Sequence, residues 1–310
     1  MAELPKDKAF GSSAFIFEEE KEGKVMKAAF LFCMVMMTLV IVVPASAQSP
    51  VVELYDDFQA KVLDPNKWSG GESSAAGVDV LESGRQIKNE PLFGLRWLDI
   101  FNRSYASVAS DTERSTAYNR LSFADGSNIT TIQATVMVRK IQATACSTNT
   151  LATEPRARIG GMYFNRVAGA PEAPGDATND VRAFIVIRRA SDSTNPANEL
   201  NIVGQVVLCE DADCDTNTQI GTVNVGTAIV NLPVKVRITW EPGNNRFAFQ
   251  KGKAPEVYIN NTVPVGGAPG TDLGGNKRVE VNHQIPNCTS TPRPMAFMEA
   301  YFDNIKVNPQ

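Results

Sequence analysis

Histidine is almost absent from this chain, and its scarcity excludes several kinds of site. His283 is the only histidine among 310 residues, so zinc centres with several histidine ligands and hydrolases of the H-E-x-x-H type are excluded. A large excess of charge is also lacking, because 30 basic and 34 acidic residues give a net charge of −4. That balance provides no basic footprint for nucleic acid and no attraction to an anionic membrane. We therefore expect no nucleic-acid partner.

Helical periodicity is missing as well, and alternation with a period of two takes its place. Val234, Val236, Ile238 and Trp240 fall on one face of a segment whose intervening residues are polar, which is typical of a half-buried strand. Many short strands separated by Gly, Pro, Asn and Asp, with no helices between them, predict an all-β, antiparallel two-sheet jelly-roll sandwich in a single domain. The expected strands are 78–89, 97–105, 119–124, 131–138, 157–166, 181–189, 201–208, 218–225, 234–241, 247–249, 256–259, 277–283 and 296–307.

The N-terminal 47 residues read as a targeting region. Residues 28–43 are apolar apart from Thr38, follow a lysine, and end at Pro44-Ala45-Ser46-Ala47. This is the pattern of a secretory signal peptide over 26–47, cleaved near Ala47. A membrane anchor is the alternative, but the run is shorter than the about 20 apolar residues that a bilayer span needs. We expect a secreted or periplasmic protein with no stable membrane insertion after cleavage.

Residues 1–25 do not fit a signal peptide, because they are polar and acidic where a short basic region belongs. We interpret them as an over-called N-terminal extension, with Met26 as the initiator. Lys21-Glu22-Gly23 can be encoded by a purine-rich ribosome-binding sequence shortly before Met26, which favours a bacterial source. The exported domain is then 48–310.

Four of the five cysteines lie in the exported domain: 146, 209, 214 and 288. An even number in an oxidising compartment favours two disulfides, and four cysteines allow three pairings. Cys209 and Cys214 flank a short acidic turn and can staple a hairpin, which leaves Cys146 and Cys288 for a long-range bridge. Free buried thiols are the alternative.

Both ends of the exported domain carry motifs that indicate a family. Asp56-Asp57-Phe58, followed by the Leu63–Trp68 segment L-D-P-N-K-W, resembles the opening of concanavalin A-like lectin/glucanase (laminin-G-like) jelly rolls. The closing Tyr301–Val307 segment resembles their last strand, which pairs beside the first, and 238–247 resembles their central hairpin. This superfamily includes glycoside hydrolases, lectins and adhesion modules, so the resemblance implies the fold and does not choose a function.

Catalytic motifs are lacking. The glucanases of this superfamily carry their carboxylate pair on one strand as E-x-D-x-E or E-x-D-x-x-E, since alternate residues share a face, and no such segment occurs here. Nucleophile-elbow, phosphate-loop and dinucleotide motifs are missing too. His283 has no nucleophile positioned for it by any motif. We expect a non-catalytic protein.

Binding residues are predicted at two places. Trp97 lies among Arg96, Asp99, Asn102 and Arg103, and an aromatic ring with Arg, Asp and Asn neighbours suits the apolar face and the hydroxyls of a sugar. Core packing is the alternative for Trp97, and we assign Trp68 and Trp240 to the core. Asp303 shares strand parity with apolar residues, and the family resemblance implies a structural Ca²⁺ held there by oxygen ligands.

These observations predict a secreted, non-catalytic domain that binds a carbohydrate or an extracellular matrix or cell-surface partner. One alternative is a glycoside hydrolase or polysaccharide lyase with a non-standard active site. The other is a purely structural surface protein.

Overall fold

The computed structural model describes residues 50–90, 94–126, 128–166, 176–212, 214, 216–263 and 277–310. The predicted extension over 1–25 and the signal peptide over 26–47 lie outside these ranges. Within the described ranges, no helix has the length and apolar character needed to cross a membrane.

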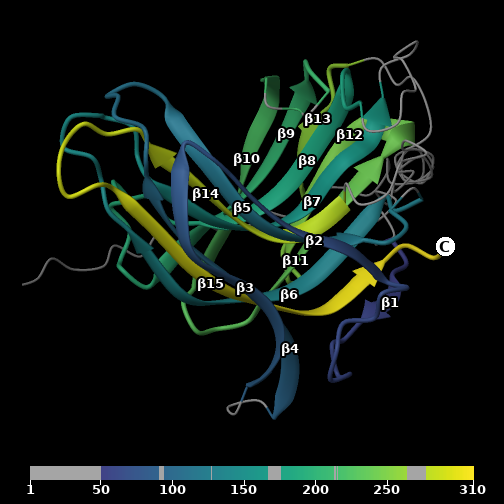
Figure 1. The fold of residues 1–310 in the computed structure, drawn as a ribbon. Helices are drawn as coiled ribbons and strands as arrows, with labels where there is room; N and C mark the ends of the chain where they lie inside the picture. The colour runs from purple at the N-terminus through teal and green to yellow at the C-terminus, as the bar shows by residue number, and fades with distance from the viewer. Residues whose placement is uncertain are drawn as a thin grey trace, which may run out of the picture. The chain divides into compact units, whose positions relative to one another are not determined.

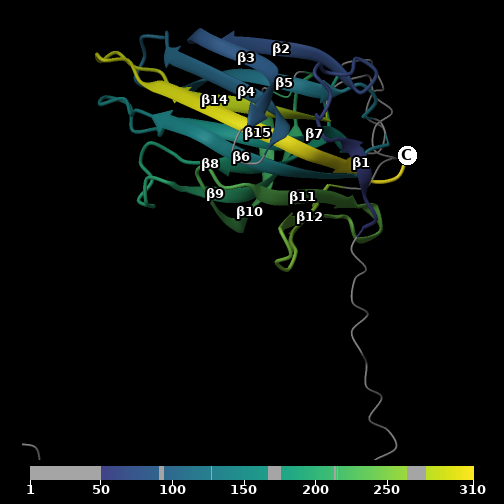
Figure 2. The same ribbon diagram turned by 90° about the horizontal axis from the view of Figure 1, so that it is seen from below.

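Two antiparallel sheets stack face to face and confirm the predicted jelly-roll sandwich (Figures 1 and 2). The eight-stranded sheet runs in the order β13 (Val257–Asn260), β12 (Arg246–Lys251), β11 (Val234–Glu241), β6 (Thr131–Ala143), β15 (Met295–Val307), β4 (Leu95–Ala106) and β3 (Val78–Glu90), with β1 (Glu53–Asp56) also paired to β15. The seven-stranded sheet runs in the order β10 (Asn217–Ile229), β9 (Glu199–Cys209), β8 (Asp180–Arg188), β7 (Glu154–Arg166), β14 (Lys277–Pro286), β5 (Arg114–Phe123) and β2 (Trp68–Ala76).

The core lies between the sheets and is built from the apolar residues of the period-two pattern. Ile238 and Trp240 of β11 lie in it opposite residues of the other sheet, and the predicted hairpin places Trp240 opposite Phe247 of β12. Their rings pack with centroids 4.6 Å apart. The turn between these strands is the 3₁₀ segment η2 (Pro242–Asn244), which ends at Asn245 in the left-handed region. Asparagine tolerates that conformation better than other residues with a side chain.

The first and last strands pair, as the family resemblance implies. Glu53 stands opposite Val307, and Asp56 stands opposite Ile305. Asp56 also accepts hydrogen bonds from the Phe58 backbone N–H, at 2.8 Å, and from the indole Nε1 of Trp68, at 2.7 Å. The Asp-Asp-Phe motif therefore anchors the turn that carries Trp68 into the core. Together with the two-sheet sandwich, this pairing confirms the resemblance to concanavalin A-like domains at the level of the fold.

The sequence pattern located the described strands except β1, which only the family resemblance implied, and β2. β2 is rich in Ser, Gly and Ala, residues with low strand propensity, so neither β-branched residues nor alternation marked it.

Both proposed disulfides are present. Cys146 and Cys288 are bonded across 142 positions of sequence, and Cys209 and Cys214 are bonded across five. The second bridge joins the end of β9 to the turn before β10, as the hairpin interpretation expects.

Candidate ligand-binding face

The outer face of the seven-stranded sheet is built from the residues that alternate with the core residues. In β14, Val279 and Val281 lie in the core, so Arg278, Glu280, Asn282 and Gln284 point away from it. The strand register carries this parity to β5, β7, β8 and β9. Figure 1 shows both sheets bent in the same direction, with the seven-stranded sheet on the inner side of the bend.

Arginine dominates this outer face, which we call the arginine face. Seven arginines occupy its outward positions: Arg114, Arg120, Arg156, Arg158, Arg182, Arg188 and Arg278. Among the side chains that the structure describes, four acidic residues occupy outward positions: Glu154, Asp180, Glu199 and Glu280. Among the described side chains of this face the arginines therefore outnumber the carboxylates, although the whole chain has a net charge of −4.

One group of arginines surrounds Glu280 and Phe184. Glu280 is 0% exposed and forms ion pairs with Arg158 and with Arg278, the latter at 2.8 Å. The guanidinium groups of Arg158, Arg278 and Arg182 lie 4.4, 5.3 and 5.9 Å from the centre of the Phe184 ring. Burial alone would raise the pKa of Glu280, but the charges of Arg158 and Arg278 outweigh it and hold that pKa at about 2. The carboxylate is therefore ionised at neutral pH.

Gly160 makes this convergence possible. It stands between Arg278 and Phe184 in register and carries no side chain that would separate them. Its φ is +136°, and a Cβ there would lie 2.1 Å from the carbonyl oxygen of Ala183. Only glycine is compatible with that position.

A second group surrounds Glu154. The carboxylate lies 2.6 Å from a nitrogen of Arg156, 2.6 Å from Arg188 and 3.6 Å from Arg114. Gln284 accepts hydrogen bonds from Arg156, at 2.6 Å, and from Arg114, at 3.2 Å. Burial alone would raise the pKa of Glu154, but Arg156 and Arg188 outweigh it and lower that pKa. Each group thus combines three arginines with one ionised carboxylate.

A row of polar side chains crosses the sheet and includes two arginines of the second group. It runs, from β5 to β9, through Tyr118, Asn282, Arg156, Arg188 and Asn201, which are opposite one another in register. Asn282 is buried, and its Oδ1 has no hydrogen-bond partner among the described residues.

A second orphaned atom lies beside this row. Nε of the buried Arg158 also lacks a partner within the described part of the chain. Buried polar atoms of this kind are rare in native folds and call for an explanation, such as a bound molecule.

Trp97, one of the predicted ligand-binding residues, is covered in the structure. It is 2% exposed and packs with Tyr301 and Met137 on the outer face of the eight-stranded sheet. Asp99 is buried beside it, accepts a hydrogen bond from Gln86 and lies 3.6 Å from the ammonium of Lys88. Sugar stacking on Trp97 stays a prediction, and it requires this small cluster to open.

The other three predicted ligand-binding residues lie in different surroundings. Asn102 is fully buried toward the interior with Ser104. Arg96 donates hydrogen bonds to Gln59 and Asn89, and Arg103 pairs with Glu82. The five residues share β4 but not one surface, because neighbouring strand positions point to opposite faces.

Asp303, the predicted calcium ligand, is buried at the end of β15 near β1. Its Oδ2 accepts a hydrogen bond from Asn304, at 2.6 Å, whereas its Oδ1 has no partner among the described residues. Burial raises the pKa of Asp303 to about 6, and the nearby carboxylates of Asp57 and Asp56 add to the rise. An orphaned carboxylate oxygen among acidic neighbours fits a hard cation such as Ca²⁺.

His283 is buried between the sheets. Its Nδ1 lies 2.6 Å from the hydroxyl of Ser104 on β4, so the fold does bring a serine to this histidine. Both side chains are 0% exposed, and burial lowers the pKa of His283 to about 3. The pair is enclosed in the core, where a substrate has no access to it.

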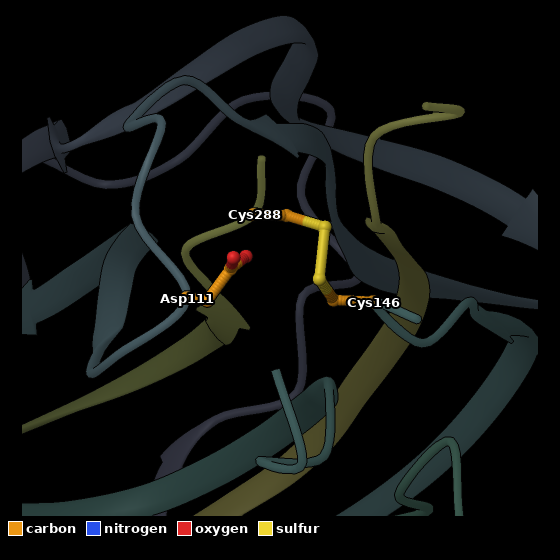
Figure 3. Close-up of side chains that lie close together, drawn as sticks. All are labelled: Asp111, Cys146 and Cys288. Carbon is orange, nitrogen blue, oxygen red and sulfur yellow. A yellow bond between two sulfur atoms is a disulfide. The ribbon is translucent and has the colours of Figure 1, made fainter. Parts of the chain in front are cut away.

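Another group of potential metal ligands contains Asp111, Cys146 and Cys288 (Figure 3). The two sulfur atoms are bonded to each other, so neither is available as a thiolate. Asp111 accepts hydrogen bonds from the hydroxyl groups of Thr148 and Thr289. The group therefore fixes two loops and offers no thiolate to a metal.

The sequence carried a signal for the arginine face that strand prediction alone does not use. Charged residues alternate with apolar ones at Arg156 and Arg158 and again at Arg278 and Glu280. Such alternation is ordinary for a solvent-facing strand, and only the register of five strands brings these residues together.

No family model matches the chain. No curated protein matches it either.

Among solved structures, a beta-1,3-glucanase from Mycobacterium marinum matches with 14% identity and a TM-score of 0.34, covering 82% of this chain and 100% of the glucanase. A glycoside hydrolase family 16 endo-glucanase from Bacteroides ovatus matches with 10% identity and a TM-score of 0.33, covering 80% and 98%. An alginate lyase from Klebsiella pneumoniae matches with 10% identity and a TM-score of 0.35, covering 72% and 84%. At these values the comparisons assign neither an activity nor a ligand to the chain.

Proposed function

We propose that this protein binds glycans on the arginine face. One observation carries the proposal: polar side chains are buried on a face that points away from the core. Buried polar groups normally have partners, yet Asn282 Oδ1 and Arg158 Nε have none among the described residues. Hydroxyl groups of a sugar chain would supply a donor to the first and an acceptor to the second.

Binding is better supported than hydrolysis. A glycosidase needs one carboxyl group that is protonated and one that is ionised. Glu154 and Glu280 both have lowered pKa values because arginines surround them, so neither suits the role of general acid. A hydrolase or lyase with another set of residues is the alternative, and an extracellular protein partner or a structural role is the other.

Glycan binding is tested by measuring how much of the purified domain is retained by a panel of insoluble neutral and acidic polysaccharides. Tyr118→Ala removes an aromatic side chain from the polar row, where the Arg120 guanidinium lies 4.8 Å from its ring. We expect that variant to lose retention. Tyr258→Ala on the eight-stranded sheet is the control, because Arg246 stacks on that ring in the same way, at 3.8 Å.

Three results would contradict the proposal. They are retention by no polysaccharide, equal loss in both tyrosine variants, and loss in Trp97→Ala with no loss in Tyr118→Ala. Product release, followed as new reducing ends or as unsaturated sugar, would replace the binding function by the enzymatic alternative.

We also propose that the domain is exported and that Asp303 holds a structural Ca²⁺. Two disulfides within one domain fit an oxidising compartment. Mass spectrometry of the protein from its native host would show a chain beginning near Gln48, and a chain that retains residues 26–47 would contradict export by a cleaved signal peptide. The role of Asp303 is tested by urea denaturation of the natural protein and of Asp303→Asn, each with EDTA or with calcium.

A further inference from the structure

We infer that the outer face of the eight-stranded sheet holds a site of covalent self-modification, where the amine of Lys88 and the carboxyl group of Asp99 form an amide bond with Glu299 as the base. The inference goes beyond glycan binding and does not depend on the arginine face. It follows from the contacts of these three side chains beside a small aromatic cluster.

Three neighbouring strands bring the reacting groups together. Lys88 lies on β3, Asp99 on β4 and Glu299 on β15, and the strands follow one another in this order in the sheet. The ammonium nitrogen of Lys88 is 3.0 Å from Oε1 of Glu299 and 3.6 Å from Oδ2 of Asp99. A fixed pair of this kind reacts intramolecularly, and well-oriented pairs reach effective concentrations of about 10⁵–10⁸ M. Such concentrations favour a condensation that free amines and acids do not complete in water.

The surroundings of Asp99 favour its neutral form. Its side chain points away from the core, on the face opposite Leu98 and Ile100, yet it is only 1% exposed. Its Oδ1 has no hydrogen-bond partner among the described residues. Burial raises the pKa of Asp99, against the opposing hydrogen bond from Gln86 and the charge of Lys88. An amine attacks a protonated carboxyl group more readily than a carboxylate, because the negative charge of a carboxylate repels a nucleophile.

Lys88 needs a base in contact with it, and Glu299 is that base. The amine begins as an ammonium group, because its hydrogen bonds to Tyr301 and to Glu299 raise its pKa, and an ammonium group is no nucleophile. Burial alone would raise the pKa of Glu299, but the hydrogen bond and the charge of Lys88 outweigh it and lower that pKa. One carboxyl group with a raised pKa beside one with a lowered pKa is the arrangement that divides the acid and base roles.

The bond forms without any reagent beyond the three side chains. Glu299 accepts a proton from the ammonium of Lys88, and the free amine attacks Cγ of the protonated Asp99. The new C–N bond forms, the C–OH bond breaks, and the hydroxyl group leaves as water with a proton from the attacking nitrogen. Glu299 ends protonated and releases its proton to solvent. No atom is oxidised or reduced.

The aromatic neighbours protect the product. Trp97 and Tyr301 are each 2% exposed and pack with Met137, and the Lys88 ammonium lies 5.4 Å from the centre of the Tyr301 ring. Side chains that exclude water also slow hydrolysis of the amide. Because β3 is the last strand in the described order of its sheet, the bond would hold an edge strand covalently to its neighbour.

Mass spectrometry of the intact protein, after reduction of its disulfides, tests the bond. We expect a mass lower by one water than the sequence gives. Trypsin cuts after Arg85, Arg96 and Arg103 but not after a modified lysine. The digest should therefore contain a branched peptide in which 86–96 is joined to 97–103, and fragmentation should place the branch between Lys88 and Asp99.

Two variants separate the roles. Lys88→Arg keeps the positive charge but removes the primary amine, and Glu299→Gln keeps the shape of the base but cannot accept the proton. Both should stay folded in thermal unfolding and should keep the full mass. Lys140→Arg is the matched control, because Lys140 contacts the same glutamate, at 3.5 Å, from β6 on the other side of β15. It should lose one water as the natural protein does.

Four results would overturn the inference. They are a natural protein with its full mass, a branch that starts at Glu299 instead of Asp99, a loss of water that persists in Lys88→Arg, and a bond that forms as completely in Glu299→Gln as in the natural protein. None of these results bears on glycan binding, which the retention experiment tests separately.

Discussion

Asp303→Asn is expected to stabilise the calcium-free protein at neutral pH. The pKa of Asp303 is about 6 in the fold against an ordinary value of 3.8, so the folded protein holds its proton more tightly than the unfolded chain. Stability contributed by the protonated form is complete below pH 4 and is lost as the pH rises to 6. The difference in pKa corresponds to a cost of at most about 3 kcal/mol above pH 6. Asparagine keeps the shape and removes the charge.

The assay is urea denaturation at pH 4 and pH 8, each with EDTA or with calcium. In EDTA we expect Asp303→Asn to raise the free energy of unfolding at pH 8 and to change it little at pH 4. Calcium should stabilise the natural protein at pH 8 and should not stabilise the variant. Asp79→Asn, at an exposed ion pair with Arg293, controls for removal of a charge.

A variant that is destabilised equally at both pH values would refute the assignment of the pKa. A natural protein that ignores calcium would refute the metal site.

Two other predictions concern the disulfides and the histidine. Replacing Cys146 and Cys288 by serine should cost about 5 kcal/mol of unfolding free energy, because that bridge closes a loop of 142 positions. The same change at Cys209 and Cys214, which close a loop of five, should cost about 2 kcal/mol; denaturation that ranks the pairs in the opposite order would contradict the chain-entropy argument. His283 stays neutral in the fold to about pH 3, so stability should fall by about 1.4 kcal/mol per pH unit below pH 6.5. Because the chain has one histidine, its proton NMR signals are assigned at once, and any titration between pH 5 and 8 would contradict this prediction.

The sequence was sufficient for the fold because the fold depends on alternation and on turns. Val234–Trp240 shows a period of two, and Asp56-Asp57-Phe58 marks a first strand that pairs with the last. β2 was missed because its small residues carry neither signal.

The arginine face could not be predicted from the sequence, for a different reason. Arg120, Arg158, Arg182 and Arg278 lie far apart along the chain, and each looks like an ordinary solvent-facing residue of its strand. Only the register of the neighbouring strands shows that they form one face. Trp97, by contrast, drew attention because of its neighbours in sequence, but alternate positions of β4 point to opposite sides of the sheet.

The pairing of β1 with β15 determines how the domain can be joined to other molecules. The backbone N–H of Gln310 donates a hydrogen bond to the side chain of Glu53, at 3.3 Å, so the two ends of the sandwich are neighbours. Both belong to the eight-stranded sheet, whereas the arginine face is on the seven-stranded sheet. A short linker could therefore close the domain into a circular permutant, and a tether at either end would leave the arginine face directed away from its support.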